Sequence, residues 1–270
     1  MLDSMWGVGL RPAHFSSYYE LSNVPPLEIM TDNLLHHRGG PALHHTLRIA
    51  SRAPCVFLHG IGLNIGGADP LCSEYLKGLL DLVEQFKPRV ISDHLCFTQA
   101  DGRQSYELLP LVRNLDMLEH VVAKVDALQQ FLGRQICLEN VSAYVAYWND
   151  VIPEGEFLNT IADKSGCGIL LDVNNVFVSA RNFNLDPLIE LNRYDFSLVK
   201  QIHIAGHSVR DDFLFDTHDS PVCQDVWSLL KHTLNHAPDV PVILENDNNL
   251  STLDELLEEL AHGKAACANG

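Results

Sequence analysis

The chain has 270 residues and a formal charge of −17, because 18 Lys and Arg residues face 35 Asp and Glu residues. A hydrophobic content of 46% with 20% charged residues is typical of a globular protein and excludes a disordered or collagen-like chain. Nucleic acids and anionic membranes are poor partners for so acidic a protein, because like charges repel.

The cysteines and the N-terminus indicate where the protein works. Seven cysteines is an odd number, and none of them forms a C-x-x-C pair, which favours a reducing compartment over a disulfide framework. The first residues lack the basic and apolar regions of a signal peptide, and no apolar run approaches the roughly 20 residues that span a bilayer. We therefore expect a cytoplasmic protein with no membrane partner.

Short apolar runs alternate with longer amphipathic segments along the whole chain. The runs are apolar throughout, which is typical of parallel strands buried on both faces. They lie at residues 8–10, 27–30, 55–59, 89–93, 135–139, 168–172, 199–204 and 242–245. Eight strand–helix units in about 260 residues predict one (βα)8 TIM barrel over residues 1–262. Residues 263–270 are small and polar, and we expect a short flexible tail there.

Histidines and carboxylates occupy the ends of six consecutive predicted strands. Active sites of (βα)8 barrels lie at the carboxyl ends of the strands, where the loops converge. The strand ends carry His59, His94, Glu139, Asp172, His203 and Glu245, and nearby loop positions add Asn175, Asp216 and His218. Carboxylates gathered in one pocket repel each other unless cations neutralise them. The pattern predicts a multinuclear metal site, whose imidazole and oxygen ligands suit iron, zinc or manganese.

Seven segments carry a family resemblance that covers nearly the whole chain. They are GVGLRPAH at 7–14, HGIGL at 59–63, SDHL at 92–95, LENVS at 138–142, LLDVNN at 170–175, HIAGHS at 203–208 and DTHD at 216–219. In this order the chain resembles the multinuclear non-haem iron-dependent oxidative enzymes of the methanobactin-biosynthesis type. That family lies within the xylose-isomerase-like TIM-barrel superfamily, which also includes the trinuclear zinc apurinic endonuclease.

The resemblance implies three metal positions and assigns their ligands. One position is held by His59, His94 and Glu139. The second shares Glu139 as a bridge and adds Asp172, His203 and Glu245, and the third uses Asn175, Asp216 and His218. The amide of Asn175 is a neutral and weaker donor than the histidine of the endonuclease, so we expect the third metal to be held loosely. Two or three irons of mixed Fe(II) and Fe(III) state are the implied cofactor.

The resemblance also implies the reaction class and the partners. Dioxygen is the cosubstrate, a cysteine thiolate of a ribosomally made precursor peptide binds one iron, and a hydrogen is taken from the cysteine β-carbon. Oxazolone with thioamide, thiooxazole and excision of the β-carbon are all products within the family, and the sequence does not select among them. Family members work with a small leader-binding partner protein, so we expect a heterodimer.

Several further residues are candidates for supporting roles. His207 is expected to orient a ligand or transfer a proton, and Asn140 and Asn246 to hold the carboxylates that precede them. Arg11 and His14 could contact a substrate carboxylate or backbone, although packing or a loop salt bridge is an equally good interpretation. Asn33 lies in Asp-Asn-Leu where relatives often have Glu-Asn-Tyr, in an expected substrate-facing loop.

Two other functions would use the same ligands. Metal-dependent phosphodiester hydrolysis or sugar isomerisation occurs elsewhere in the superfamily. The acidic charge and the lack of a basic, aromatic-rich groove argue against DNA as the substrate. A binding module with purely structural metals is disfavoured, because structural sites are usually closed and often rich in thiolates.

Overall fold

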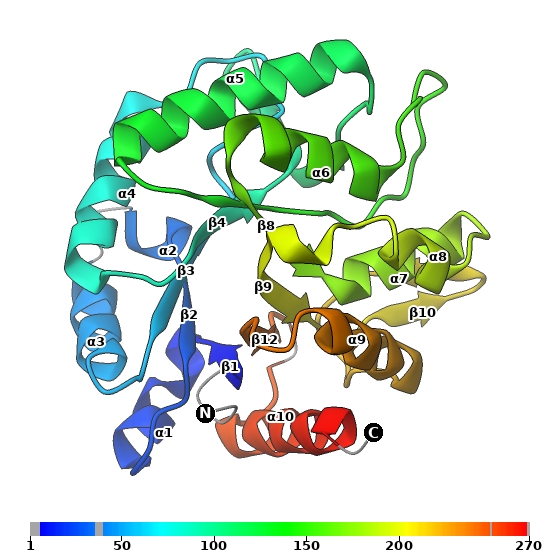
Figure 1. Ribbon diagram of the computed structural model, residues 1–270. Helices are drawn as coiled ribbons and strands as arrows, with labels where there is room; N and C mark the ends of the chain where they lie inside the picture. Colours follow the sequence, from blue (N-terminus) through cyan, green and yellow to red (C-terminus); the bar gives the residue numbers. More distant parts are fainter. Residues whose placement is uncertain (1–5, 36–39, 249, 269–270) are drawn as a thin grey trace.

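In the computed structural model, which describes residues 6–35, 40–248 and 250–268, eight parallel strands close into a barrel (Figure 1). These strands are β1 (Trp6–Gly9), β2 (Leu27–Met30), β3 (Val56–Gly60), β4 (Ile91–His94), β7 (Cys137–Glu139), β8 (Gly168–Asp172), β9 (Val199–Ile204) and β12 (Val242–Leu244). Their order around the barrel is β1-β12-β9-β8-β7-β4-β3-β2. The predicted single (βα)8 barrel is confirmed, with each strand within two residues of its expected position.

Helices surround the barrel on its outside (Figure 1). The long ones are α3 (Gly40–Ala50), α4 (Ser73–Phe86), α5 (Leu115–Leu132), α6 (Glu154–Ser165), α7 (Val173–Asn182), α9 (Gln224–His236) and α10 (Leu253–Ala268). Shorter ones are α1 (Phe15–Glu20), α2 (Asp32–Leu35) and α8 (Pro187–Leu191), with 3-10 turns at Pro12–His14 and Phe196–Leu198. No helix in the described ranges is long and apolar enough to cross a membrane.

The final helix differs from the sequence prediction. Helix α10 continues to Ala268, so residues 263–268 are helical and not a flexible tail beginning at residue 263. Ala265, Ala266 and Ala268 explain this, because alanine has the highest helix propensity. The helix continues through Gly263. An added Cβ at this position would collide with the Trp227 ring, so the close packing of the helix requires glycine.

Helix α5 illustrates how local sequence positions an outer helix. The Asn114 side chain caps its start by accepting a hydrogen bond of 3.0 Å from the backbone N–H of Met117. Gly133 ends the helix with a φ of +66°, in the left-handed region that favours glycine. Between the caps, Leu118, Val121, Val125, Leu128 and Leu132 are buried, so one apolar face packs against the barrel.

The barrel interior contains an apolar layer beneath a polar one. Phe57, Val90, Cys137, Leu170 and Ile243 form a separate buried cluster. Side chains two residues apart on a strand point to the same side, so the next inward positions on four of these strands are His59, Glu139, Asp172 and Glu245. The alternation of strand residues therefore places the candidate ligands inside the barrel, at the carboxyl ends.

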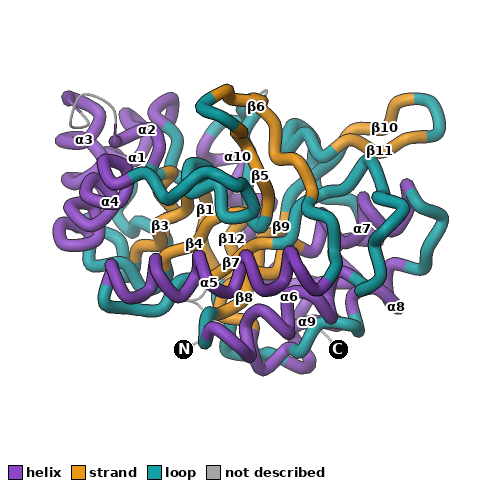
Figure 2. The backbone as a smooth tube through the Cα atoms, turned by 90° about the horizontal axis from the view of Figure 1, so that it is seen from above, coloured by secondary structure: helices purple, strands orange, loops and turns teal. Residues whose placement is uncertain are grey.

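Two β-hairpins extend from this carboxyl end (Figure 2). Strands β5 (Cys96–Ala100) and β6 (Arg103–Pro110) follow β4, and strands β10 (Ser208–Arg210) and β11 (Phe213–Phe215) follow β9. The second hairpin leads directly into Asp216 and His218. Its geometry therefore positions two candidate ligands that belong to no barrel strand.

Candidate metal centre

Three neighbouring strands contribute the first group of ligands. His59 is the penultimate residue of β3, His94 ends β4 and Glu139 ends β7. His94 lies opposite Glu139 in the strand register. The Nε2 atoms of His59 and His94 lie 3.1 and 3.2 Å from Oε2 of Glu139. Ligand atoms of the three side chains all lie within 4.8 Å of one another. One cation can contact all three.

The hydrogen bonds on the far side of each ring fix which nitrogen faces the site. Nδ1 of His94 lies 3.0 Å from the backbone oxygen of Gly60, which can only accept, so Nδ1 carries the proton. Nδ1 of His59 lies 2.9 Å from Oγ of Ser92, whose own hydroxyl donates to the backbone oxygen of Leu58. In the neutral rings, both Nε2 lone pairs therefore face a carboxylate oxygen. Two acceptors this close repel unless a cation lies between them.

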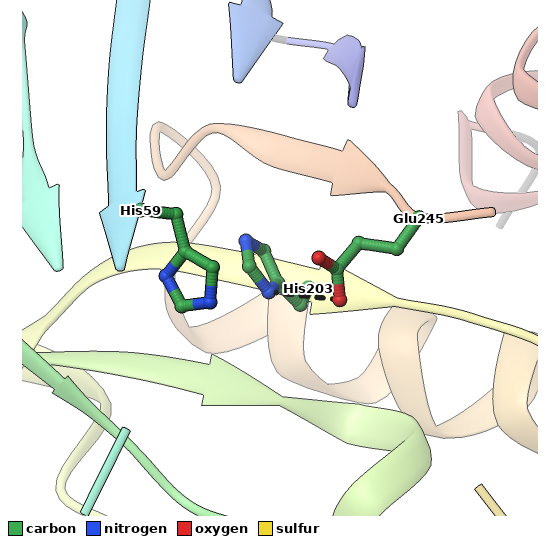
Figure 3. Close-up of side chains that lie close together, drawn as sticks. All are labelled: His59, His203 and Glu245. Atoms are coloured by element: carbon green, nitrogen blue, oxygen red, sulfur yellow. Dashed lines mark ion pairs between the residues drawn. The ribbon is translucent and has the colours of Figure 1, made fainter. Parts of the chain in front are cut away.

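A second group lies beside the first and shares Glu139 with it. Ligand atoms of Glu139, Asp172, His203 and Glu245 lie within 4.8 Å of one another. Nδ1 of His203 is 3.0 Å from Oε1 of Glu139 and 3.2 Å from Oε2 of Glu245. Figure 3 shows His203 directed at Glu245, with His59 next to it. The buried Glu28 lies 2.8 Å from the opposite nitrogen, Nε2, and can accept the proton that fixes the ring.

A third group comes from the segments that follow β11 and β12. Nε2 of His218 lies 2.7 Å from Oδ1 of Asp216. Nδ1 of His218 lies 3.0 Å from Oδ2 of Asp247, whose other oxygen pairs with Arg11. Because Asp247 accepts from Nδ1, the Nε2 lone pair of the neutral ring is directed toward Asp216. As in the pair of His94 and Glu139, an imidazole Nε2 here faces a carboxylate oxygen.

Four buried ligand atoms in these groups have no hydrogen-bond partner among the described residues: Glu139 Oε2, Asp172 Oδ2, Asn175 Oδ1 and His218 Nε2. Asp172 and Asn175 are otherwise fixed, because Oδ1 of Asp172 accepts from the backbone N–H of Asn175 at 2.7 Å. Buried polar atoms without partners are rare in proteins. Their number here, with oxygen and imidazole as the donors, fits bound transition metals.

The pKa values of the buried side chains indicate an excess of negative charge at this site. Burial, and then Asp216 and Glu139, raise the pKa of Asp172 well above its usual value. Burial opposes a charge on His59, but Glu139 and Glu28 outweigh it and raise the pKa of His59 to about 9. Without metal, a proton on His59 takes the place that a cation would occupy.

These groups line one small pocket of about 160 Å³ at the barrel mouth. Its polar floor includes His59, His94, Glu139, Asn175, Asp216, His218 and Glu245. Its other walls include the apolar side chains of Met30, Ile61, Leu108 and Val141. The pocket therefore combines ligands for cations with apolar walls that limit the access of water.

Comparison with known proteins agrees with this geometry. Residues 5–268 match the family described as RiPP precursor modification enzyme MbnB/TglH/ChrH, where RiPP denotes a ribosomally synthesised and post-translationally modified peptide. The chain belongs to this family. The enzymes of this family modify precursor peptides.

The chain is also similar to relatives over most of their length. A UPF0276 protein from Anaeromyxobacter sp. (strain Fw109-5) is 41% identical over 256 residues, covering 94% of this chain and 89% of its own. A UPF0276 protein from Caulobacter vibrioides is 37% identical over 267 residues, covering 98% and 95%.

Similar solved structures show the fold. Endonuclease IV from Thermus thermophilus has a TM-score of 0.62 at 15% identity, over 98% of this chain and 100% of that one. A xylose isomerase domain containing protein from Salmonella typhimurium has a TM-score of 0.66 at 11% identity, over 99% and 98%. These likenesses show that the chain shares the (βα)8 barrel fold of those structures.

Three predicted supporting residues of this family member lie behind the candidate ligands and do not line the pocket: Asn140, Asn246 and His207. Asn140 bridges β7 and β8, because its amide both donates to the backbone oxygen of Asp172 and accepts from its N–H, each at 2.9 Å. Asn246 donates to the backbone oxygen of His218 at 3.1 Å. His207 bonds to Asn174 at 2.8 Å, and Asn174 donates to Asp216 at 2.8 Å.

The three residues considered for substrate binding lie outside the lining of the metal pocket. Arg11 is paired with Asp247, so its guanidinium is already engaged. His14 is buried and donates through Nε2 to the backbone oxygen of Ser251 at 2.8 Å. Asn33 lines a different cavity, of about 290 Å³, together with residues of β2 and α3. Arg11 thus forms a salt bridge and His14 a hydrogen bond within the chain, which are contacts of the kind expected from the alternative of packing or a loop salt bridge.

Sequence reasoning missed Glu28, Asp247 and Asn174. Glu28 interrupts the otherwise apolar strand Leu27–Met30, and a charge inside a buried strand is a signal that it has a partner. Asp247 lies two residues after Glu245, and Asn174 is adjacent to Asn175. Nothing in the sequence distinguishes Asp247 and Asn174 from ordinary loop and helix-start residues, because their partners are distant in the sequence.

Proposed function

We propose that this protein oxidises a cysteine residue of a ribosomally made precursor peptide, using iron held at the barrel mouth and dioxygen as the oxidant. Family membership supports a peptide substrate. The observation that carries the metal-dependent chemistry is the position of the imidazole nitrogens that face carboxylate oxygens at 2.7–3.2 Å. Such contacts are stable when cations are shared between the groups.

Two or three irons are the proposed complement. His59, His94 and Glu139 would hold one, and Glu139, Asp172, His203 and Glu245 a second. Asn175, Asp216 and His218 would hold a third, more weakly because the Asn175 amide is neutral. Bound iron supplies one-electron chemistry with dioxygen and lowers the pKa of a thiol that binds to it.

The chain's own residues would orient the ligands and limit water. Glu28 holds His203, Asp247 holds His218, and Asn140 fixes the backbone of Asp172. We assign Asn246 to holding the His218 backbone, and His207 to orienting Asp216 through Asn174. The apolar walls at Ile61, Leu108 and Val141 would exclude water from a cysteine side chain in the pocket.

A separate leader-binding protein completes the proposal, as a heterodimer. The net charge of −17 would speed association with a partner or leader peptide that carries a basic face. All described strands and helices belong to one barrel with two hairpins, so leader recognition by a second protein is consistent with this architecture.

The test is oxygen consumption by protein purified without oxygen. The substrate would be a short cysteine-containing peptide encoded beside this gene, and the metal content would be measured on the same sample. We expect iron, oxygen uptake that requires the peptide, and a change in peptide mass that is absent in His94→Ala but retained in His232→Ala. Zinc alone, with no iron-dependent uptake, would overturn the oxidative assignment. Cleavage of an abasic oligonucleotide would favour the hydrolase alternative.

A further inference from the structure

A second and larger cavity lies on the other side of a loop that borders the metal pocket. This outer cleft has a volume of about 460 Å³. The loop consists of residues 140–153, between β7 and α6. Val141 and Ser142 line the metal pocket, whereas Ala143 and Ala146 line the outer cleft. Helix α7 also borders both cavities, because Asn175 lines the metal pocket and Val176 lines the outer cleft.

The charged groups of the outer cleft are engaged with one another. Arg113 donates to Asp150 at 3.0 Å, and the Tyr194 hydroxyl donates to Glu154 at 3.1 Å. Arg193 pairs with Glu190 at 3.1 Å. An uncharged ligand can therefore bind without leaving these charged groups unpaired. Much of the remaining lining is apolar and consists of Val151, Ile152, Val176, Ala180, Phe183 and Leu185.

Large apolar side chains are exposed around the outer cleft. Trp148, near the middle of the loop, is 96% exposed, and Val151 is 70% exposed. Leu185 and Ile189, on the α7–α8 side, are 49% and 58% exposed. Exposed apolar surface gathered around a cavity is typical of an interaction site. A second copy of this chain is a poor occupant, because each copy carries a charge of −17.

We propose that the outer cleft binds an apolar side chain of the precursor peptide, a few residues from the cysteine that enters the metal pocket. This inference rests on the proposed function, because it requires a peptide substrate. The loop from Ser142 to Ala146 spans at most about 14 Å, since an extended chain advances at most about 3.6 Å per residue. A peptide crossing this loop reaches both cavities with a separation of about three to six residues.

The test uses synthetic twelve-residue glycine–serine peptides with one cysteine and one phenylalanine, placed two to eight positions apart. The protein is the full chain loaded with zinc, which binds thiolate without redox chemistry. Affinity is read from the change in tryptophan emission on adding peptide. We expect this change to come from Trp148, because Trp6 and Trp227 are buried and their surroundings stay the same. We expect peptides with one narrow range of spacings to bind about tenfold more tightly than the phenylalanine-free peptide, as burial of one aromatic ring predicts.

Variants separate the two cavities. Val151→Asp should remove the tenfold gain, and Phe131→Asp should retain it, because Phe131 is 41% exposed and does not line the outer cleft. His94→Ala should weaken the contribution of the cysteine and leave that of phenylalanine. Failure of the proposed function alone would therefore appear as a lost cysteine contribution with the phenylalanine gain intact.

Three results would overturn the inference. The first is equal affinity for all spacings and for the phenylalanine-free peptide. The second is a gain that survives Val151→Asp. The third is self-association of the wild-type protein that Val151→Asp abolishes in sedimentation, because the outer cleft would then be covered by a second copy.

Discussion

Nε2 of His94 lies 3.2 Å from Oε2 of Glu139, while the ring proton is directed the other way, to the backbone oxygen of Gly60. Burial lowers the pKa of His94, so its ring is neutral near pH 7. A lone pair and a carboxylate oxygen at this distance repel, and a shared cation removes the repulsion. This pair therefore supports the proposal that metal ions bind at the barrel mouth.

Replacing His94 by alanine should reduce the metal content. His94→Ala removes one of the three proposed ligands at the first position, so we expect the protein to lose about one metal ion per chain. Elemental analysis after anaerobic reconstitution with iron measures this. His232→Ala is the matched control, because His232 is on the outer helix α9 and bonds to Asn192. Equal metal content in both variants would contradict the assignment.

Glu28 should control the metal affinity without being a ligand. The carboxylate fixes the proton on Nε2 of His203, and loss of such partners typically weakens metal binding by about 10–100-fold. We expect Glu28→Leu to show a loss of this size in competition with a chelator, and Glu28→Gln a smaller one, because its amide oxygen can still accept. The exposed Glu20→Gln serves as the control. Unchanged affinity in Glu28→Leu would show that His203 needs no such partner.

Asn140 should stabilise the barrel between β7 and β8. Its side chain makes two hydrogen bonds to the backbone of Asp172, and it is fully buried. Asn140→Ala leaves buried backbone groups without partners, which costs about 1–3 kcal/mol. Urea unfolding of the metal-free protein measures the loss. Asn235→Ala on the exposed side of α9 should change the free energy of unfolding little, and an equally small change in Asn140→Ala would refute the bridging role.

The ion pair between Arg11 and Asp247 should make stability depend on pH in the acid range. Burial opposes the charge on Asp247, but the His218 hydrogen bond and the Arg11 guanidinium outweigh it and hold the pKa of Asp247 well below its usual value. A carboxylate with a lowered folded pKa contributes stability above its unfolded pKa of about 4, and this contribution is lost as the pH falls further.

Metal-free wild type should therefore be more stable than Asp247→Asn at pH 7, and the difference should shrink steadily below about pH 4. Thermal unfolding in the presence of a chelator measures it. Asp212→Asn, in the exposed turn of the β10–β11 hairpin, should show no such difference at either pH. A gap for Asp247→Asn that stays constant from pH 7 to pH 3 would mean that the ion pair is not responsible.

The barrel was predictable from the sequence because its physical signals are local. Eight predominantly apolar runs, separated by segments of helical period, mark strands buried on both faces. The hairpins β5–β6 and β10–β11 were not predicted, because their strands are short or exposed and lack that pattern. The flexible tail was predicted to begin at residue 263, within what is helix α10, since small residues near a terminus resemble a frayed end although alanine favours helix.

The candidate site was partly predictable for the same reason. Strand ends converge in any such barrel, so the positions of His59, Glu139 and Glu245 followed from the strand assignment. Side-chain partners such as Glu28 with His203 join residues 175 apart in sequence. Such contacts depend on the closure of the barrel and the register of its strands, and no local pattern encodes them.

The most direct test of the account is an anomalous diffraction measurement at the iron edge, on crystals of protein purified and reconstituted with iron under anaerobic conditions. We predict one peak between His59, His94 and Glu139, a second beside His203 and Glu245, and a weaker third near Asn175 and His218. A map without peaks at this barrel mouth, with the imidazoles hydrogen-bonded directly to the carboxylates, would contradict the central claim.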